Sequence, residues 1–336
     1  MADPLPTIPD LTQCLRRLIA QTPAGRVTTC GGLALALGDR VAARWVGSFA
    51  LHHEHHPDCP CHRIVRAGGA LGGYVAGSIA DKRQRLADEG VFVSSEMVDL
   101  RRFLFDDFAT DRPLDRLREN QESVRRRIRI RPRRRMPRWI GGVDVAYPQP
   151  GVGSAAYALV DGRSGELAWS LTIRRPVVFP YITSYLTFRE LPILLELLDA
   201  VRAAGRLAEV LMVDGTGILH PRGAGIASHL GVAASMPTVG VIKKLLCGRV
   251  GGTGLKPGES RPVVFLDDRL IGAAVRPTAG REPLIFVSPG HRTDVAFAEQ
   301  LTRRLLMGRR LPSPVDWADR LSRRPLNLLD TSDKSP

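Results

Sequence analysis

A change of pattern near residue 140 limits the possible fold of this chain more than any other property of its sequence. From there on, short runs of small and β-branched residues alternate with polar turns, and the first three runs follow one another directly. Helices are predicted at 190–204 and 294–306, and strands at GGVDVAY, SAAYALV, LAWSLTI, EVLMVDG, RPVVFLD, LIGAAVR and PLIFVSPG. Three consecutive strands, followed by helices alternating with strands, predict an α/β domain whose mixed sheet has helices on its faces.

The first hundred residues have a mainly helical pattern instead. Apolar spacing predicts helices over 10–20, 31–37 and 41–51, and the threonines at 28 and 29 are candidate caps for the second. Gly38 separates the second helix from the third, and such a pair has the outline of a helix-turn-helix. Arg44 would then face DNA, although a solvated helix arginine is the simpler interpretation of this residue by itself.

Positive charge is concentrated between these two regions. The 336 residues include 48 Lys and Arg against 34 Asp and Glu, a formal net charge of +14, and residues 101–142 alone hold 14 basic and 6 acidic residues. After a polar helix predicted over 114–127, nine of the 14 residues in 125–138 are arginines, and two prolines forbid a continuous helix there. We predict an arm that binds phosphates by counterion release, with a solvated linker as the alternative.

Several function classes are excluded by what the sequence lacks. No run approaches the roughly 18 to 20 apolar residues of a membrane helix, and the first residues have no secretion-signal pattern. The five cysteines form an odd, irregular set that indicates reduced thiols. We expect a cytoplasmic protein without membrane partners, and the oligomeric state is not predicted. The expected organisation is a first domain at 1–98, a basic linker and helix at 99–138, a second domain at 139–325 and a tail at 326–336.

The segment Pro60-Cys-His-Arg-Ile-Val65 carries the first chemical signal. A thiol is nucleophilic only as a thiolate, which a neighbouring base favours, and for a lone Cys-His pair an inert buried thiol is the usual alternative. Residues 10–90 as a whole resemble the C-terminal domain of O6-alkylguanine-DNA alkyltransferases, with further matches at 25–29, 42–47, 69–74 and 86–90.

This resemblance implies a winged helix-turn-helix domain that repairs alkylated guanine in DNA. Cys61 would accept the alkyl group irreversibly, His62 would act as a base through a bound water, and Glu89 would orient His62. Arg44 would enter the stack from the minor groove and fill the gap left by the flipped guanine, while Tyr74 lies in the base-binding segment.

Three family positions differ in this chain. Cys30 replaces a tyrosine that presses on the target nucleotide, His53 replaces a hinge asparagine, and Val75 replaces a serine of the base-binding segment. Each change removes a polar contact and predicts a slower reaction or an altered lesion preference. The retained Cys61 favours an acceptor over the non-enzymatic relatives that bind alkylated bases, which lack this cysteine.

Histidines and a cysteine crowd the approach to this motif. Imidazole and thiolate are ligands that zinc prefers, but the spacing matches no standard finger, so we expect no zinc site here. The residues concerned are His52, His53, His55, His56, Cys59 and His62.

Acidic residues at strand and helix ends carry the second chemical signal. Asp144 lies within the first predicted strand of the second domain, Asp214 ends the fourth, and Glu190 opens a helix. A single strand aspartate is more often a hydrogen-bonded structural group, but three carboxylates of this kind suit a site for Mg²⁺, which prefers oxygen ligands.

Residues 115–310 resemble endonuclease V, the repair nuclease for deaminated adenine. The matching segments are Gly142–Tyr147, Pro180–Ile182, Thr187–Pro192, Val213–Gly217, His220–Gly231, Pro237–Lys244 and Val287–Arg292. The resemblance implies a ribonuclease-H-like fold. It also implies cleavage of the second phosphodiester bond 3′ to deoxyinosine, which leaves a 3′-hydroxyl and a 5′-phosphate.

The same resemblance assigns roles to further residues. Asp144, Glu190 and Asp214 would hold Mg²⁺, for which Mn²⁺ can substitute. His220 and Lys243 would lie beside the scissile phosphate. Tyr181 would belong to the wedge that separates the strands, and His291 would lie at the mouth of the pocket. The wedge ends in Thr183-Ser184 here, where the family has Pro-Gly.

We therefore predict a bifunctional DNA repair enzyme that acts on alkylated or deaminated bases in double-stranded DNA and extends to single-stranded DNA. In the first alternative, the N-terminal domain only binds alkyl lesions. In the second, the nuclease cleaves RNA, with inosine-containing RNA as the case to compare, or cleaves nucleic acid of a particular structure.

Overall fold

A computed structural model describes residues 6–252, 254–277 and 283–325 of the chain. The tail predicted at 326–336 lies outside the described residues. Within the described part, no helix is both long and apolar enough to cross a membrane. All five cysteines lie in these ranges, and each is a free thiol.

The chain divides into two units, which we describe separately. The division falls inside one helix, α6 (Pro113–Arg127), between Glu119 and Asn120. A short segment, 179–185, groups with the N-terminal unit although it follows the first three strands of the second unit in sequence. Among the described residues, the N-terminal unit is therefore formed by 7–119 and 179–185, and the second unit by Pro6, 120–178 and 186–325.

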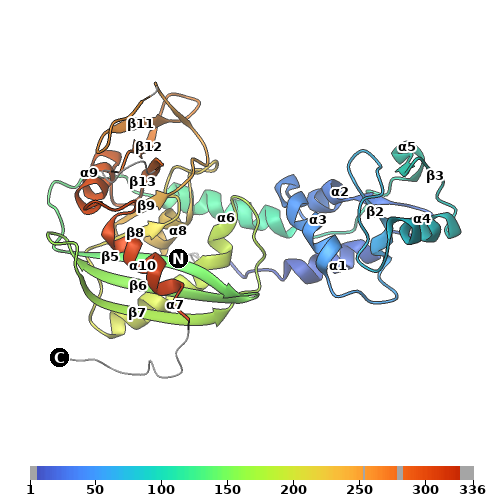
Figure 1. Cartoon of the computed structure of the whole chain (residues 1–336), viewed down its shortest axis with the longest axis horizontal. Helices are drawn as coiled ribbons and strands as arrows, with labels where there is room; N and C mark the ends of the chain where they lie inside the picture. The colour runs from blue at the N-terminus through green and yellow to red at the C-terminus, as the bar shows by residue number, and fades with distance from the viewer. Residues whose placement is uncertain (1–5, 253, 278–282, 326–336) are drawn as a thin grey trace. The chain divides into compact units, whose positions relative to one another are not determined.

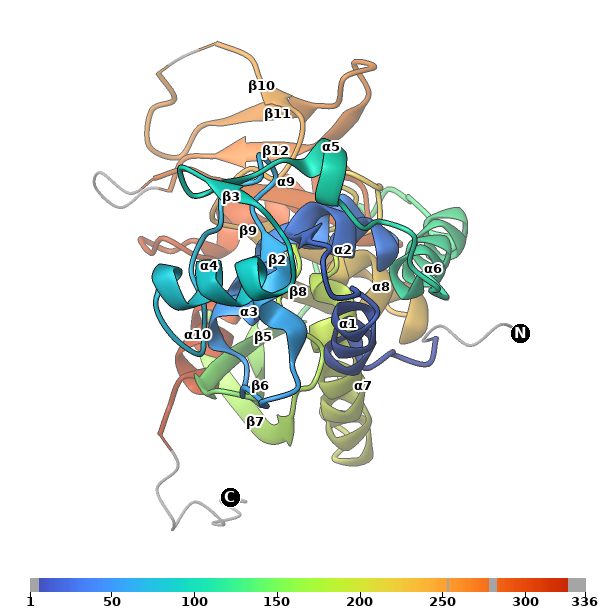
Figure 2. The same cartoon turned by 90° about the vertical axis from the view of Figure 1, so that its right-hand side faces the viewer.

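The three helices predicted for the N-terminal unit are confirmed. Asp10 caps the first by accepting a hydrogen bond from the amide of Gln13, and Thr29 caps the second by accepting from Gly32. The third begins with a single 3₁₀ turn. The elements of this unit, drawn in Figure 2, are α1 (Leu11–Ala20), β1 (Thr28–Thr29), α2 (Cys30–Ala36), η1 (Arg40–Ala42), α3 (Ala43–His52), η2 (Pro60–Arg63), β2 (Ile64–Val65), α4 (Ile79–Asp88), β3 (Val93–Ser94), β4 (Met97–Val98) and α5 (Leu100–Phe103).

The second unit is built on the predicted mixed sheet, which is confirmed. Among the described residues, nine strands lie in the order β10-β11-β12-β13-β9-β8-β5-β6-β7, all but β10 labelled in Figure 1, and of their pairs only β5–β8 and β8–β9 are parallel. The strands are β5 (Trp139–Gln149), β6 (Val152–Asp161), β7 (Leu167–Pro176), β8 (Val210–Asp214), β9 (Thr238–Ile242), β10 (Arg249–Val250), β11 (Ser260–Val264), β12 (Leu270–Val275) and β13 (Ile285–His291).

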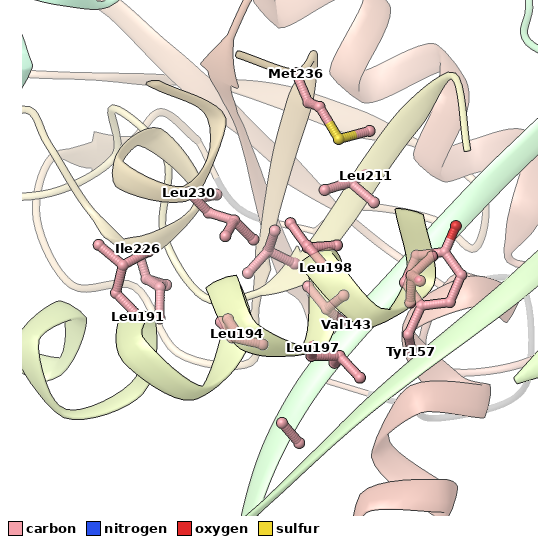
Figure 3. Close-up of a cluster of buried hydrophobic side chains, with 14 of the residues drawn as sticks. Val143, Tyr157, Leu191, Leu194, Leu197, Leu198, Leu211, Ile226, Leu230 and Met236 are labelled. Atoms are coloured by element: carbon pink, nitrogen blue, oxygen red, sulfur yellow. The ribbon is translucent and has the colours of Figure 1, made fainter. Parts of the chain in front are cut away.

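Helices cover both faces of this sheet. On one face, α7 (Leu186–Ala203) and α8 (Ile226–Ala233) pack against β5, β6 and β8, and Figure 3 shows this apolar cluster around Val143, Leu194 and Leu211. On the other face lie α9 (Val295–Leu305) and α10 (Ser313–Ser322). Because strand residues alternate between faces, neighbouring positions of β5 and β8 point to different helix layers.

Four elements of the second unit are not predicted from the sequence pattern: α8, β9, β10 and α10. Helix α8 starts in a glycine-rich stretch and is hydrophobic on nearly all sides, so it has no amphipathic signature. Helix α10 is short, has prolines at its N-cap and its second residue, and mixes charged with apolar residues. Its position depends on packing against β5 and β6, which is a tertiary property.

The arginine-rich segment predicted as an arm at 125–138 is partly ordered against the sheet. Its first three residues end α6, and the chain after them forms hydrogen bonds with the end of β13. The amide of Arg131 donates to the carbonyl of Thr293, and the amide of Arg292 donates to the carbonyl of Arg129. The backbone of the segment is thus anchored, while most of its arginine side chains stay at least partly exposed.

Candidate functional sites

Cys61 lies in the η2 turn of the N-terminal unit. Pro60 starts this turn, and the parallel pairing of β2 with β1 fixes the residues directly after it. The Cys61 side chain is buried, and its Sγ lies 3.5 Å from Nδ1 of His55. A hydrogen bond between the thiols of Cys59 and Cys61 lowers the pKa of Cys59 to about 5. The same hydrogen bond raises the pKa of Cys61, and burial raises it further.

His62 and Glu89 form the pair that the sequence predicts. His62 Nε2 lies 2.7 Å from Glu89 Oε1, and the guanidinium of Arg63 binds the same carboxylate. Burial lowers the pKa of His62 against the opposing effect of Glu89, so the imidazole is neutral at neutral pH. Its other nitrogen, Nδ1, is buried without a hydrogen-bond partner among the described residues. A neutral imidazole with an unpartnered ring nitrogen, on the residue that follows Cys61 in sequence, has the properties of a general base.

Tyr74 and Lys82 surround the same turn. The Tyr74 ring makes edge contacts with His55 and His62, at centroid distances of 6.0 and 6.4 Å. Lys82 is buried, and its ammonium group donates to the carbonyl of Ile64, in the strand directly after the cysteine turn, and to the carbonyls of Leu71 and Gly73. Burial lowers the pKa of Lys82 to about 8. One buried cation therefore holds the backbone around Cys61 together.

Arg44 lies in the first turn of α3 with its side chain exposed to solvent. The positions that differ from the alkyltransferase pattern are also ordered. Cys30 begins α2, and burial raises the pKa of its thiol. His53 ends α3, where its Nδ1 bonds the carbonyl of Phe49 at 2.9 Å and the two rings stack.

The register of two parallel strands brings together two carboxylates of the second unit. Val143 of β5 pairs with Val213 of β8, so the residues that follow them, Asp144 and Asp214, lie side by side. The valines point into the α7 layer, and the aspartates point to the opposite face. The sequence prediction that these two aspartates converge agrees with this geometry.

Helix α10 adds a third carboxylate that sequence reasoning missed. Oxygen atoms of Asp144, Asp214 and Asp319 all lie within 4.8 Å of one another. Ser322 of the same helix donates to Asp144 Oδ2 at 2.6 Å. A helix aspartate among arginines has no signal of its own in the sequence, and only the packing of α10 on β5 reveals it. Three converging carboxylates are a donor set that fits a hard divalent cation such as Mg²⁺.

Lys243, which follows β9, bridges two of these carboxylates. Its Nζ lies 2.8 Å from Asp214 and 2.9 Å from Asp319. Burial by itself lowers the pKa of Lys243. The two aspartates together have the larger effect, so the pKa of Lys243 is raised. Burial and the neighbouring Asp214 raise the pKa of Asp144 to about 6. The ammonium group thus balances the negative charges of carboxylates that would otherwise repel one another within the site.

Glu190 lies near this cluster but is not one of the three converging carboxylates. It sits in the second turn of α7, is buried, and accepts a hydrogen bond from the Tyr147 hydroxyl at 3.1 Å. Burial raises the pKa of Glu190 to about 8, and the charges of Asp144 and Asp214 contribute to this rise. The two aspartates are therefore within electrostatic reach of Glu190.

The approach of α10 to β5 depends on Gly142. A Cβ atom at this position would lie 1.9 Å from the backbone oxygen of Pro314, so the helix would have to move. We expect Gly142→Ala to lower the free energy of unfolding by about 2 kcal/mol and to reduce metal-dependent activity, because Asp319 moves with the helix. Chemical denaturation and a cleavage assay measure both effects. Gly251→Ala is the control, because a Cβ there meets nothing within 4 Å; equal behaviour of the two variants would contradict the prediction.

The remaining predicted residues occupy different settings. Tyr181 is 64% exposed, as a stacking residue requires, and Ser184 holds a left-handed φ of 65° at a position where the family has glycine. His220 is buried, and its Nδ1 accepts the amide of Arg222 at 3.2 Å. His291 is also buried, and its Nδ1 accepts the amide of Arg129 at 3.2 Å, which ties the arginine-rich segment to β13.

Comparison with known families matches both units. A model of the family described as "Endonuclease V" matches residues 122–320, and a model of "6-O-methylguanine DNA methyltransferase, DNA binding domain" matches residues 10–91. Both resemblances identified in the sequence are thereby confirmed.

Curated relatives carry the same two parts. The chain is 34% identical over 241 residues to a bifunctional methyltransferase/endonuclease of Picrophilus torridus, covering 72% of this chain and 77% of the relative. It is 33% identical over 296 residues to a protein of the same name from Thermoplasma volcanium, covering 87% and 83%.

Solved structures resemble the second unit. The catalytic domain of human endonuclease V matches with a TM-score of 0.59 and 31% identity, over 64% of this chain and 96% of that one. Ciona intestinalis endonuclease V, solved with a 24-mer DNA containing an inosine followed by a ribo-adenosine, matches with a TM-score of 0.57 and 26% identity, over 63% and 97%. This likeness confirms the predicted ribonuclease-H-like fold. The chain therefore belongs to the family of bifunctional methyltransferase/endonucleases, in which an alkyltransferase DNA-binding domain precedes an endonuclease V domain.

Proposed function

We propose that this protein repairs two kinds of base damage in DNA. The N-terminal unit transfers alkyl groups from O6-alkylguanine to Cys61, and the second unit cleaves the second phosphodiester bond 3′ to deoxyinosine. The observation that carries the proposal is the presence of both chemical centres in one chain: a buried cysteine beside a His–Glu pair, and three converging carboxylates. We place the functional domains at 1–98 and 139–325, joined by the basic segment 99–138.

For alkyl transfer, the geometry supports a division of labour around Cys61. His62 takes the thiol proton through a water at its free Nδ1, and Glu89 keeps the imidazole oriented. The helices α2 and α3 act as a helix-turn-helix of winged type. Arg44, exposed on α3, fills the gap left by the flipped base, and Tyr74 lies beside the base.

For cleavage, Asp144, Asp214 and Glu190 hold the divalent cation, and we add Asp319 to this set because its oxygen lies within 4.8 Å of those of Asp144 and Asp214. Mg²⁺ bound there supplies an activated water and offsets the charge of the phosphate. Lys243 keeps its ammonium group at the edge of the site, where it stabilises charge that develops on the leaving oxygen. His220 contacts the scissile phosphate, Tyr181 stacks on bases of the opened duplex, and His291 lines the approach to the pocket.

DNA as the partner agrees with charge and with the relatives. The arginine-rich segment anchored along β13 presents a dense row of cations, which is suited to phosphate contacts without base preference. The similar Ciona protein was solved with inosine-containing DNA. Its ligand carried a ribonucleotide after the inosine, so inosine in RNA is the second candidate substrate for the nuclease.

The test is a paired assay of the full-length protein on duplexes that contain O6-methylguanine or deoxyinosine, with and without EDTA. We expect cleavage to require the metal and to fall at least about a hundredfold on chelation. Methyl transfer during a short incubation persists, and the methyl group is found by mass spectrometry on Cys61. Binding of O6-methylguanine without any adduct would reduce the N-terminal unit to a lesion-binding module. The same cleavage assay on an inosine-containing RNA strand compares RNA with DNA directly as substrates.

A further inference from the structure

Four metal-ligand side chains meet beside the cysteine turn, a grouping that no role assigned above explains. They are His53, His55, Cys59 and Cys61, and one ligand atom of each lies within 4.8 Å of the others. Cys59 Sγ lies 3.4 Å from His53 Nε2, and Cys61 Sγ lies 3.5 Å from His55 Nδ1. Two of the four residues are buried, and the other two are half-buried.

These distances suit a tetrahedral ion. Zinc binds sulfur at about 2.3 Å and imidazole nitrogen at about 2.0 Å, which places neighbouring sulfur and nitrogen ligands about 3.5 Å apart. The two measured sulfur–nitrogen separations have this length already. The chain between α3 and η2 has no regular secondary structure, so the remaining contraction from 4.8 Å needs only small movements of a loop.

His53 is held in the orientation that a ligand requires. Its Nδ1 donates to the carbonyl of Phe49 at 2.9 Å, and its ring stacks on the Phe49 ring with a centroid distance of 4.9 Å. A donated Nδ1–H leaves the lone pair on Nε2, the atom that faces Cys59. Metal-binding histidines characteristically donate their second ring nitrogen to a carbonyl in this way.

We propose that His53, His55, Cys59 and Cys61 form a Zn²⁺ site in which Cys61 is both a ligand and the alkyl acceptor. The proposal revises the expectation that no zinc binds here. That expectation depended on the spacing of the residues along the sequence, which matches no standard zinc finger, and the spatial arrangement of the four side chains now outweighs it. Two thiolates and two neutral imidazoles make a neutral complex with a divalent ion and match the preference of zinc for soft ligands. The ion would also cross-link a loop that contributes few apolar side chains to the core.

The chemical consequence rests on the proposed role of Cys61 as acceptor. Zinc binding keeps the Cys61 sulfur as a thiolate, so His62 takes the thiol proton when the ion binds and not during alkyl transfer. A lone pair on Cys61 Sγ forms the bond to the alkyl carbon as the carbon–O6 bond breaks, and that electron pair stays on O6. Guanine leaves as its anion and takes a proton from water, with no change in oxidation state. The product is a neutral thioether, which binds zinc more weakly than a thiolate does.

Zinc content of the full-length protein is the first test. After purification with zinc supplied and dialysis against excess Mg²⁺, which displaces zinc from the carboxylates, we expect about one zinc per chain. His53→Asn, which introduces the amide found at this position in related alkyltransferases, and Cys59→Ser should lower the zinc content at least about tenfold. His56→Asn is the matched control, since the His56 side chain is exposed and outside the cluster. Deoxyinosine cleavage by each variant verifies that the rest of the chain is intact.

Cobalt substitution is the second test and needs no variant. Co²⁺ in this site should give the thiolate charge-transfer band and the visible bands of a tetrahedral complex. Methylation by O6-methylguanine DNA should lower the charge-transfer intensity by about half, because one of two thiolates becomes a thioether. The site is refuted if the wild-type protein holds no zinc or shows no thiolate–cobalt band. It is also refuted if both the His53→Asn and the Cys59→Ser variants keep their zinc. Methyl transfer by a zinc-free protein would leave the proposed function standing. Zinc without any methyl transfer would refute that function and not the site.

Discussion

Asp144→Ala and Asp214→Ala should each lower cleavage at deoxyinosine by at least about a thousandfold. These residues supply two of the three carboxylates that converge within 4.8 Å, and a hard cation loses both affinity and position when one is removed. A gel assay of single-turnover nicking in excess Mg²⁺ measures the effect. Asp267→Ala is the matched control, because Asp267 is exposed and outside the cluster, and it should cleave at the wild-type rate.

The same substitutions separate a functional role from a structural one. Burial and Asp214 raise the pKa of Asp144 to about 6, so at pH 7 the charged carboxylate is unfavourable in the metal-free fold. Loss of this group should therefore leave the melting temperature in EDTA unchanged or higher. Methyl transfer to Cys61 should also be unaffected. If either variant nicks deoxyinosine at full rate, the site is assigned to the wrong residues; if either unfolds in EDTA, the carboxylates are structural.

Cys61→Ala should abolish methyl transfer from O6-methylguanine DNA, to below detection, while deoxyinosine cleavage stays at the wild-type rate. The reason is stoichiometric: the acceptor sulfur is a reactant, and a missing reactant cannot be replaced by orientation or binding. Intact-protein mass spectrometry after incubation with the modified duplex counts the transferred groups.

Cys14→Ala is the control for this substitution, since Cys14 is a half-buried cysteine of α1. It should accept one methyl group like the wild type. A methyl group found on Cys59 would contradict the assignment, because the hydrogen bond between the two thiols makes Cys59 the more acidic of the pair. If the wild type binds the lesion and takes no methyl group, the N-terminal unit is a binding module.

Local sequence signals predicted most elements of the second unit, but only the helices α1, α2 and α3 of the N-terminal unit. Helix α1 begins where Asp10 caps it, and α9 begins at the Asp294 cap, because a side chain that accepts an amide proton acts over three residues. Strands β5, β6 and β7 are also local, since their runs of β-branched and small residues need only adjacent hairpin partners. Helix α10 was not predicted, because its few apolar residues favour a helix only when β5 and β6 lie beneath them.

By itself, the sequence determined the two domain families and predicted the candidate site residues, since each of these residues lies in a segment that matches a family motif. They are Cys61, His62, Glu89, Asp144, Glu190 and Asp214. Tertiary structure alone decided that Asp319 joins Asp144 and Asp214, and that Lys243 bridges Asp214 and Asp319. It also decided that His53, His55, Cys59 and Cys61 converge. The physical reason is distance. A metal ligand or a counter-ion acts through a few ångströms of space, and strand register, the bare backbone of Gly142 and the turn at Pro60 set those distances.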